Sequence, residues 1–173
     1  MRTRPAAILS TITAAILSVA VAAPAIAGSE AKAVGWVTWD GESGADPGRV
    51  SAFEVWDAAP GVRGSLEGDH GWYVLEKANG GSMRLDVHCA LIDPDGRWAE
   101  FSGRIVEATP PFTVGEVFLV SVKDSGKRGK RGDEIGMKHY DGLGKGCANA
   151  LDDDQFGRKG IITGGNIRVR GPR

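Results

Sequence analysis

One stretch of the sequence, residues 83–106, constrains the fold more than any other. Apolar residues occupy every second position from 83 to 91, which is typical of a strand with one buried face. The segment 93–96 follows with the sequence DPDG. Its proline fixes φ, its aspartates can bond their own backbone, and its glycine accepts a positive φ, so it predicts a tight turn. Alternation resumes over 99–105, and the whole stretch therefore predicts a β-hairpin.

The rest of the chain repeats this pattern of short strands and turns. It holds 26 glycines, and beyond the N-terminal segment no window keeps an apolar 3.6-residue period for more than about two turns. Besides the two arms of the hairpin, we expect strands at 34–39, 49–56, 62–67, 72–77, 115–123, 134–140 and 166–170. A total of about eight to ten short strands predicts a single antiparallel β-sandwich or a closed β-barrel. The pattern alone does not choose between them.

An export signal precedes the expected domain. Arg2 and Arg4 are followed by an apolar, alanine-rich segment at 6–23 and an A-x-A cleavage pattern at 25–27. The segment is poor in Leu and Phe, which favours a cleaved signal peptide over a retained membrane anchor. A second A-x-A pattern at 31–33 leaves the cleavage position open.

We therefore expect residues 1–27 to be a signal peptide and residues 28–173 to be one secreted β-domain, without a membrane segment. Removing Arg2 and Arg4 takes the basic side chains from 21 to 19, against 22 acidic ones, so the net charge becomes about −3. This balance does not favour a specific nucleic-acid partner. A domain of this length buries about 70% of its unfolded surface, so we expect it to fold as a monomer.

The chain has two cysteines, Cys89 and Cys147. Export places them in an oxidising compartment, where one disulfide between them is the simplest outcome. The bond would close a loop of about sixty residues and stabilise the fold by at most about 4 kcal/mol in the chain-entropy model. A catalytic thiol is the weaker interpretation, because Cys89 falls on the apolar face of the first hairpin arm.

Several short motifs follow one another in a fixed order along the chain. They are G-x-L at 64–66, V-x-C at 87–89, A-x-F-x-G at 99–103, V-x-D-x-G at 122–126, D-x-I at 133–135 and G-N-I-x-V at 165–169, with a cysteine in the C-terminal loop. This order resembles a group of secreted actinobacterial proteins of uncharacterised function, similar to the post-choice-of-anchor (post-COAP) domain. The resemblance covers residues 62–169. It implies an exported all-β module, supports the pairing of Cys89 with Cys147, and implies no known activity.

A basic loop is the first candidate binding site. Within residues 124–133, four cations fall in five positions: Lys127, Arg128, Lys130 and Arg131. On an otherwise acidic protein such a loop could hold an anionic polymer by charge. The alternative is a solvated loop without a ligand.

Tryptophan side chains are the second candidate. The chain has five of them, and aromatic side chains on an exposed β face can stack on sugar rings or on partner surfaces. The alternative is that they fill the core or close the ends of a barrel. The candidates for ligand binding are Trp36, Trp39, Trp72 and Trp98.

Recognisable catalytic and metal-binding patterns are missing from the sequence. The three histidines, His70, His88 and His139, offer no H-x-x-x-H pair, and no G-x-S-x-G or phosphate-binding glycine loop is present. Acidic segments at 93–95 and 152–154 could contribute oxygen ligands to Ca²⁺, but neither matches the twelve-residue Ca²⁺ loop. We expect no catalytic residue, no metal and no cofactor, with Ca²⁺ as the alternative.

The sequence therefore predicts an exported, non-catalytic β-domain that binds a cell-wall or other extracellular polymer, either a glycan or an anionic polymer. Two alternatives stay open. One is a secreted hydrolase with histidines and aspartates at the mouth of a barrel. The other is a lipocalin-like carrier of a small ligand.

Overall fold

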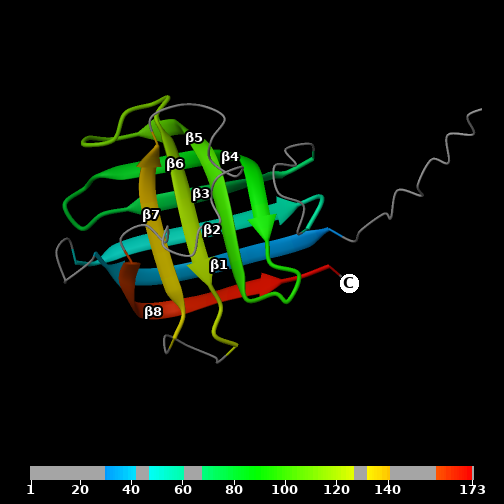
Figure 1. The fold of residues 1–173 in the computed structure, drawn as a ribbon. Coiled ribbons are helices and arrows are strands. Elements are labelled where there is room, and N and C mark those ends of the chain that lie inside the picture. The colour runs from blue at the N-terminus through cyan, green and yellow to red at the C-terminus, as the bar shows by residue number, and fades with distance from the viewer. Residues whose placement is uncertain (1–29, 42–46, 61–67, 127–131, 141–158, 173) are drawn as a thin grey trace, which may run out of the picture.

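The structure, a computed structural model, describes residues 30–41, 47–60, 68–126, 132–140 and 159–172, and every regular element among them is a strand. The strands pair antiparallel with their neighbours along the chain, and the first also pairs with the last, so the sheet closes into a barrel (Figure 1). In chain order they are β1 Ala31–Asp40, β2 Arg49–Asp57, β3 His70–Glu76, β4 Ser82–Ile92, β5 Trp98–Ala108, β6 Val117–Lys123, β7 Glu134–Tyr140 and β8 Lys159–Arg170.

This topology confirms the all-β prediction and selects the barrel over the sandwich. Closure gives each of the two terminal strands a second neighbour, which removes the exposed edges that an open sheet would present. The strand expected at 62–67 lies outside the described residues. Within the described ranges, no helix has the length and hydropathy needed to cross a membrane.

Three aromatic rings occupy the middle of the barrel. Phe53 of β2, Tyr73 of β3 and Phe101 of β5 are fully buried, with ring centroids 5.5, 6.0 and 6.4 Å apart. Strand β1 makes room for them with Gly35, where an added Cβ would lie 2.5 Å from the Phe53 ring. Each buried ring contributes about 1.5–3 kcal/mol of apolar transfer free energy. The barrel interior is therefore a packed core.

Polar atoms inside the core are paired with one another. The indole N–H of Trp39 donates to Ser51 Oγ at 2.8 Å, and Ser51 Oγ lies 2.8 Å from the Tyr73 hydroxyl. The Tyr73 hydroxyl also donates to Met137 Sδ at 3.7 Å. This pairing matters because an unsatisfied buried donor costs about 1–3 kcal/mol. Trp39, only 1% exposed, is thus a core residue, which is the alternative that the sequence left open for the tryptophans.

A β-bulge changes the inward face of β4. Val87 pairs with Gly103 and Cys89 pairs with Ser102, so β4 has one extra residue relative to β5 at this point. Beyond the bulge the core contains the side chain of Ala90 and not that of its neighbour Cys89. Cys89 is therefore buried on the outer side of the sheet, and its predicted place on the same face as Val87 is wrong.

The predicted disulfide remains a prediction. Its first cysteine, Cys89, is 1% exposed. Its second, Cys147, lies outside the described residues.

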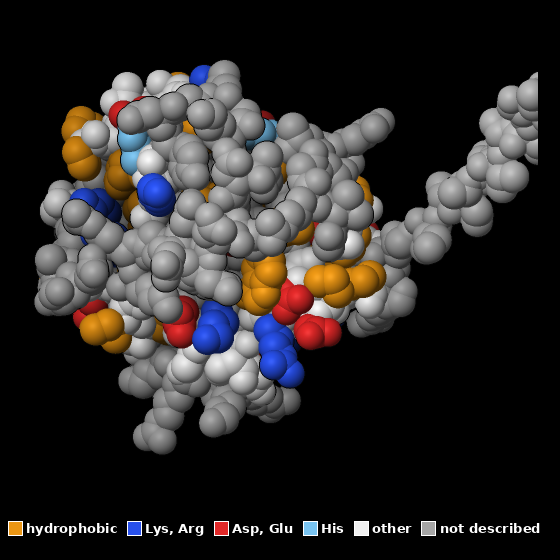
Figure 2. Space-filling model, viewed as in Figure 1, with side chains coloured by type: hydrophobic (Ala, Val, Ile, Leu, Met, Phe, Trp, Pro, Cys, Tyr) orange, Lys and Arg blue, Asp and Glu red, His pale blue; other side chains and the backbone are white. Residues whose placement is uncertain are grey.

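The surface of the described barrel carries few large apolar side chains. Figure 2 shows hydrophobic side chains on the viewed face as separate groups among charged ones. The exposed large hydrophobic residues are Val34, Trp36, Val106, Val114 and Ile161.

Candidate functional site

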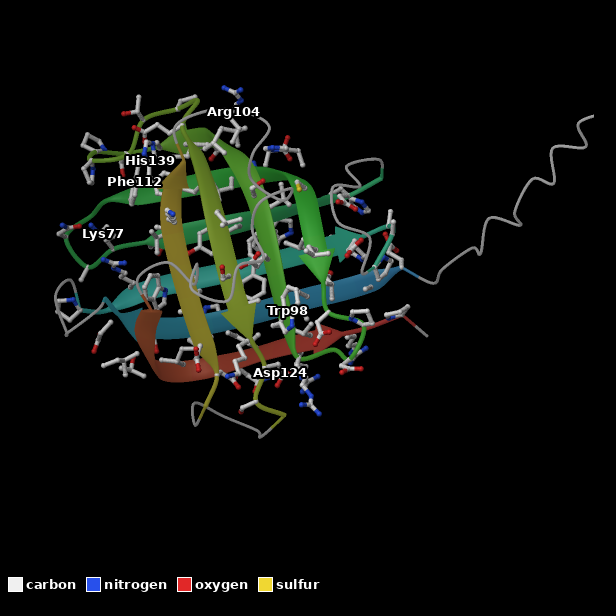
Figure 3. All side chains as sticks on the ribbon, in the orientation of Figure 1. Lys77, Trp98, Arg104, Phe112, Asp124 and His139 are labelled. Carbon is white, nitrogen blue, oxygen red and sulfur yellow. The ribbon has the colours of Figure 1, made fainter. Side chains whose placement is uncertain are left out.

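The two ends of the barrel carry different side chains. Strands β2, β4, β6 and β8 finish at one end, where Trp98 and Asp124 lie (Figure 3). We call it the aspartate end. The other end, which we call the phenylalanine end, gathers Lys77, Arg104, Phe112 and His139 (Figure 3).

At the aspartate end, two carboxylates accept hydrogen bonds from backbone N–H groups of β4 beyond the end of its described ladder with β3. The described ladder between these strands stops at Val87 of β4. Beyond it, Asp69 Oδ2 accepts the backbone N–H of Ala90 at 3.0 Å, and Asp57 Oδ2 accepts that of Ile92 at 2.8 Å. The other oxygen of each aspartate accepts a backbone N–H of the β2–β3 connection, at 3.0 and 2.9 Å. Burial raises the pKa of both carboxyls, and these hydrogen bonds oppose that rise.

A second pair of carboxylates performs the same task between β7 and β8. Asp133 Oδ2 accepts the N–H of Ile167 at 3.2 Å, and Asp124 Oδ2 accepts that of Val169 at 3.1 Å. Asp133 Oδ1 also accepts the N–H and the hydroxyl of Ser125, at 3.0 and 2.9 Å. The two ends of the connection between β6 and β7 are thereby fixed to β8.

Three of the sequence motifs meet where these two aspartates bond to β8, and we call each such line of carboxylate hydrogen bonds a seam. Asp124 belongs to the V-x-D-x-G motif and Asp133 to the D-x-I motif, and both bond to N–H groups of the G-N-I-x-V motif at 165–169. Their side chains close the barrel. These motifs are therefore explained by the fold and do not by themselves indicate a ligand.

A cleft of about 610 Å³ lies between the β4–β5 turn and the end of β6. Beside the cleft, Trp98 pairs with Lys123 in the β5–β6 ladder, and the backbone N–H of Asp124 donates a hydrogen bond of 2.7 Å to the carbonyl oxygen of Arg97. The cleft is lined by Asp95, Gly96, Arg97, Lys123, Asp124, Ser125, Gly126 and Gly132.

Two glycines allow the β4–β5 turn to contact the end of β8. Gly96 has a φ of 69°, and a Cβ there would lie 3.0 Å from the backbone nitrogen of Gly171. A Cβ on Gly171 would lie 2.0 Å from the carbonyl oxygen of Pro94. This close approach needs glycine on both sides. It places the cleft directly beside the last residues of β8.

The cleft lining holds two cations, Arg97 and Lys123, and two acids, Asp95 and Asp124, so its described residues are balanced in formal charge. Arg97 is exposed. Lys123 Nζ lies 3.3 Å from Glu134 Oε1, but this pair is solvent-exposed and such pairs contribute about 0–1 kcal/mol. Asp124 is already bonded by two backbone N–H groups, at 2.7 and 3.1 Å. Arg97 and Lys123 are thus available to an anion, next to the half-buried indole of Trp98.

The sequence-predicted basic loop adjoins this cleft. Its residues Lys127, Arg128, Lys130 and Arg131 lie outside the described residues. The residues on either side of it, Gly126 and Gly132, line the cleft. The structure therefore brings the base of the basic loop and Trp98 to one place, which the sequence pattern does not reveal.

The remaining predicted tryptophans lie elsewhere. Trp36 is 57% exposed on the outer side of β1. Trp72 is half-buried on the outer side of β3, paired with Glu54 and Asp86. Neither contributes to the lining of the cleft.

The histidines do not come together. His70 stacks on Trp56 at the aspartate end, with centroids 4.9 Å apart. His139 contacts Phe118 at the phenylalanine end, at 5.2 Å, and His88 is exposed on β4. In the part of the chain that the structure describes, no three His, Cys, Asp or Glu side chains are grouped to hold a metal ion. These positions give no support to the hydrolase alternative.

One buried carboxyl was not anticipated from the sequence. Glu100 of β5 is 3% exposed, and its Oε1 accepts the Ser121 hydroxyl at 3.1 Å. Its Oε2 is buried and accepts no hydrogen bond from any described residue. Burial raises the pKa of Glu100 to about 7. Alternation along β5 predicts a solvated face for Glu100, so no sequence pattern indicates its burial.

The sequence patterns also do not indicate Arg97 and Lys123 as binding residues. Each sits next to a turn or a strand end, where isolated cations are common and carry no pattern. Only the pairing of β5 with β6 brings them into one cleft.

The fold and the cleft define a closed, eight-stranded, up-and-down β-barrel with a packed interior and a charged cleft at one end. No family model, no curated protein and no solved structure matches the chain.

Proposed function

We propose that the domain is an exported, non-catalytic module that binds an anionic cell-envelope or extracellular polymer at the aspartate end of the barrel. The observation that carries this proposal is the cleft that holds Arg97 and Lys123 at the base of the basic loop. Trp98 pairs with Lys123 beside it and offers an apolar surface to the same ligand.

The charges around the cleft favour an extended anion over a small one. Arg97 and Lys123 face solvent, and four further cations belong to residues 127–131. Exposed cations of this kind attract a polyanion through many weak contacts, each sensitive to salt. A single small anion would gain little from any one of them.

The packed interior argues against the carrier alternative. Phe53, Tyr73 and Phe101 occupy the volume that a lipocalin-like ligand would need. Export after a signal peptide at 1–27, a Cys89–Cys147 disulfide, and membership of the post-COAP-like group belong to the same proposal. The resemblance motifs, the A-x-A pattern at 25–27 and the presence of two cysteines in the chain support them.

The test is co-sedimentation of the mature domain, residues 28–173, with purified cell walls and with a soluble polyanion. The variant Arg97→Gln/Lys123→Gln removes both cleft cations. The matched control Arg84→Gln/Lys138→Gln removes two exposed cations that do not line the cleft.

We expect the cleft variant to bind about five- to tenfold more weakly at low salt, because two exposed ionic contacts are lost. The control should bind within about twofold of wild type, and all binding should fall as salt is raised. Equal loss in the two variants would assign binding to overall charge. Absence of binding in the wild type would overturn the proposal.

A further inference from the structure

The outer side of β1 carries an exposed indole that the cleft does not use. Trp36 is 57% exposed and Val34 is 36% exposed. Trp36 stands opposite Ala52 on β2 and opposite Asn166 on β8. The small Ala52 side chain leaves one flank of the indole uncovered, so the ring rises above its surroundings.

Two exposed cations of β8 lie beside this indole. Arg168 stands opposite Val34, and Arg170 stands opposite Lys32. Diagonal neighbours on one face of an antiparallel pair lie about 7–8 Å apart, so the Arg168 side chain can reach a group held on Trp36. Among the described residues, no carboxylate forms an ion pair with Arg168 or Arg170.

The third cation of this surface, Lys32, is already engaged. Its Nζ pairs with Glu54 and lies 4.5 Å from the centroid of the Trp56 ring. The cations open to a ligand on this face are therefore those of β8.

The line of these residues leads to the cleft. The β4–β5 turn, which forms one wall of the cleft, contacts Gly171 immediately after β8. From Gly171 back along β8 come Arg170, then Arg168, then Asn166, which stands opposite Trp36 of β1. Four residues of a strand span about 13–14 Å. The wall of the cleft thus contacts the end of β8, and Arg170, Arg168 and Trp36 lie along the outer face of β8 and β1 from that point.

The chemistry of this outer face selects its occupant. Its apolar part consists of Trp36 and Val34, which is small for a stable protein–protein interface. An indole beside a guanidinium suits a sugar ring that carries a carboxylate, because the ring can lie on the indole while the carboxylate pairs with the arginine. The spacing of cations along β8 suits a repeat of such units.

We propose that Trp36, Arg168 and Arg170 extend the cleft into a binding track for an acidic polysaccharide chain. The proposal rests on the proposed function and names its ligand class: a glycan with a carboxylate on its sugar rings. A polyanion without rings would use the cations and leave the indole uncovered.

The test measures the affinity of the mature domain for two polyanions of matched length and charge. Polygalacturonate has sugar rings, and polyglutamate has none. The variants are Trp36→Ala, Trp36→Phe and Arg168→Gln. The control Ile161→Ala removes an apolar side chain that is 60% exposed on the same strand, β8, away from the track. Circular dichroism and thermal unfolding check that each variant is folded.

We expect Trp36→Ala to weaken polygalacturonate binding about tenfold and to leave polyglutamate binding within about twofold. Trp36→Phe should recover part of the loss, Arg168→Gln should weaken both ligands, and Ile161→Ala should change neither. Unchanged polygalacturonate binding in Trp36→Ala, or an equal loss for both polyanions, would overturn the track. The proposed function would still stand in either case if Arg97→Gln/Lys123→Gln weakens both polyanions.

Discussion

Asp57 Oδ2 accepts the backbone N–H of Ile92 at 2.8 Å, across 35 positions of sequence. The carboxylate takes the place of a strand at the point where the described β3–β4 ladder has ended. Asp133 stands in the same relation to Ile167, at 3.2 Å, on the other seam. The barrel thus closes with side chains where its backbone ladders are incomplete, since buried N–H groups must find partners.

Replacing Asp57 tests this role. Asp57→Ala leaves the N–H of Ile92 without its acceptor, and we expect the free energy of unfolding to fall by about 2–3 kcal/mol in urea denaturation. Asp57→Asn keeps one acceptor oxygen and should lose clearly less. Equal losses in the two variants would show that the hydrogen bond to Ile92 is not what matters.

Glu100 makes stability depend on pH. Burial raises its pKa from 4.5 to about 7 in the folded state, so folding binds a proton between these values. With respect to this group, the wild type should therefore keep its full stability at and below about pH 4.5, and should lose up to about 3 kcal/mol as pH rises from there through 7. The raised pKa values of Asp57 and Asp69 act in the same direction.

The variant Glu100→Gln isolates the contribution of this one carboxyl. Urea denaturation of wild type and variant at pH 5 and pH 8 should give a larger difference between the two proteins at pH 8, with the variant the more stable. If the two proteins show the same change between these pH values, Glu100 does not titrate as its burial indicates.

Gly35 is required by the Phe53 ring. In Gly35→Ala the new Cβ would lie 2.5 Å from two ring atoms, so the ring must shift, and we expect a loss of about 1–3 kcal/mol in the free energy of unfolding. Adding Phe53→Leu should recover part of that loss, because a smaller side chain leaves space for the methyl group. Additive losses in the double variant would place the cause elsewhere.

The predicted disulfide between Cys89 and Cys147 is testable by thiol counting. Under denaturing conditions without reductant, the mature domain should show no reactive thiol, and with reductant it should show two. The free energy of unfolding of the variant Cys89→Ala/Cys147→Ala should be lower than that of the wild type by up to about 4 kcal/mol. Two reactive thiols in the unreduced protein would show that Cys89 and Cys147 are not joined.

Local sequence patterns predicted much of the fold. The alternation from 83 to 105 and the turn at 93–96 predicted β4, β5 and their hairpin, and the apolar run at 115–123 predicted β6. The bulge between Val87 and Cys89 could not be foreseen, since it adds one residue without disturbing the hydrophobic alternation that precedes it.

The candidate site depended on contacts that sequence patterns do not contain. Lys123 reaches Trp98 through the pairing of β5 with β6, and Asp124 reaches Val169 across 45 positions. Alternation places Trp36 and Trp39, three residues apart on β1, on opposite faces of the strand, and the structure buries Trp39 on the face of Val37. The pattern does not say which face is buried, because Val34 and Val37 also lie on opposite faces.

The carboxylates of Asp124 and Asp133 separate the stability of the barrel from the sequence of the connection between β6 and β7. Asp124 and Asp133 fasten both ends of the β6–β7 connection to β8, so substitutions between Gly126 and Gly132 need not disturb the barrel. Such a connection is free to diversify while its anchors stay fixed. The same property would make the barrel a scaffold on which libraries of surface loops could be displayed and screened for new ligands.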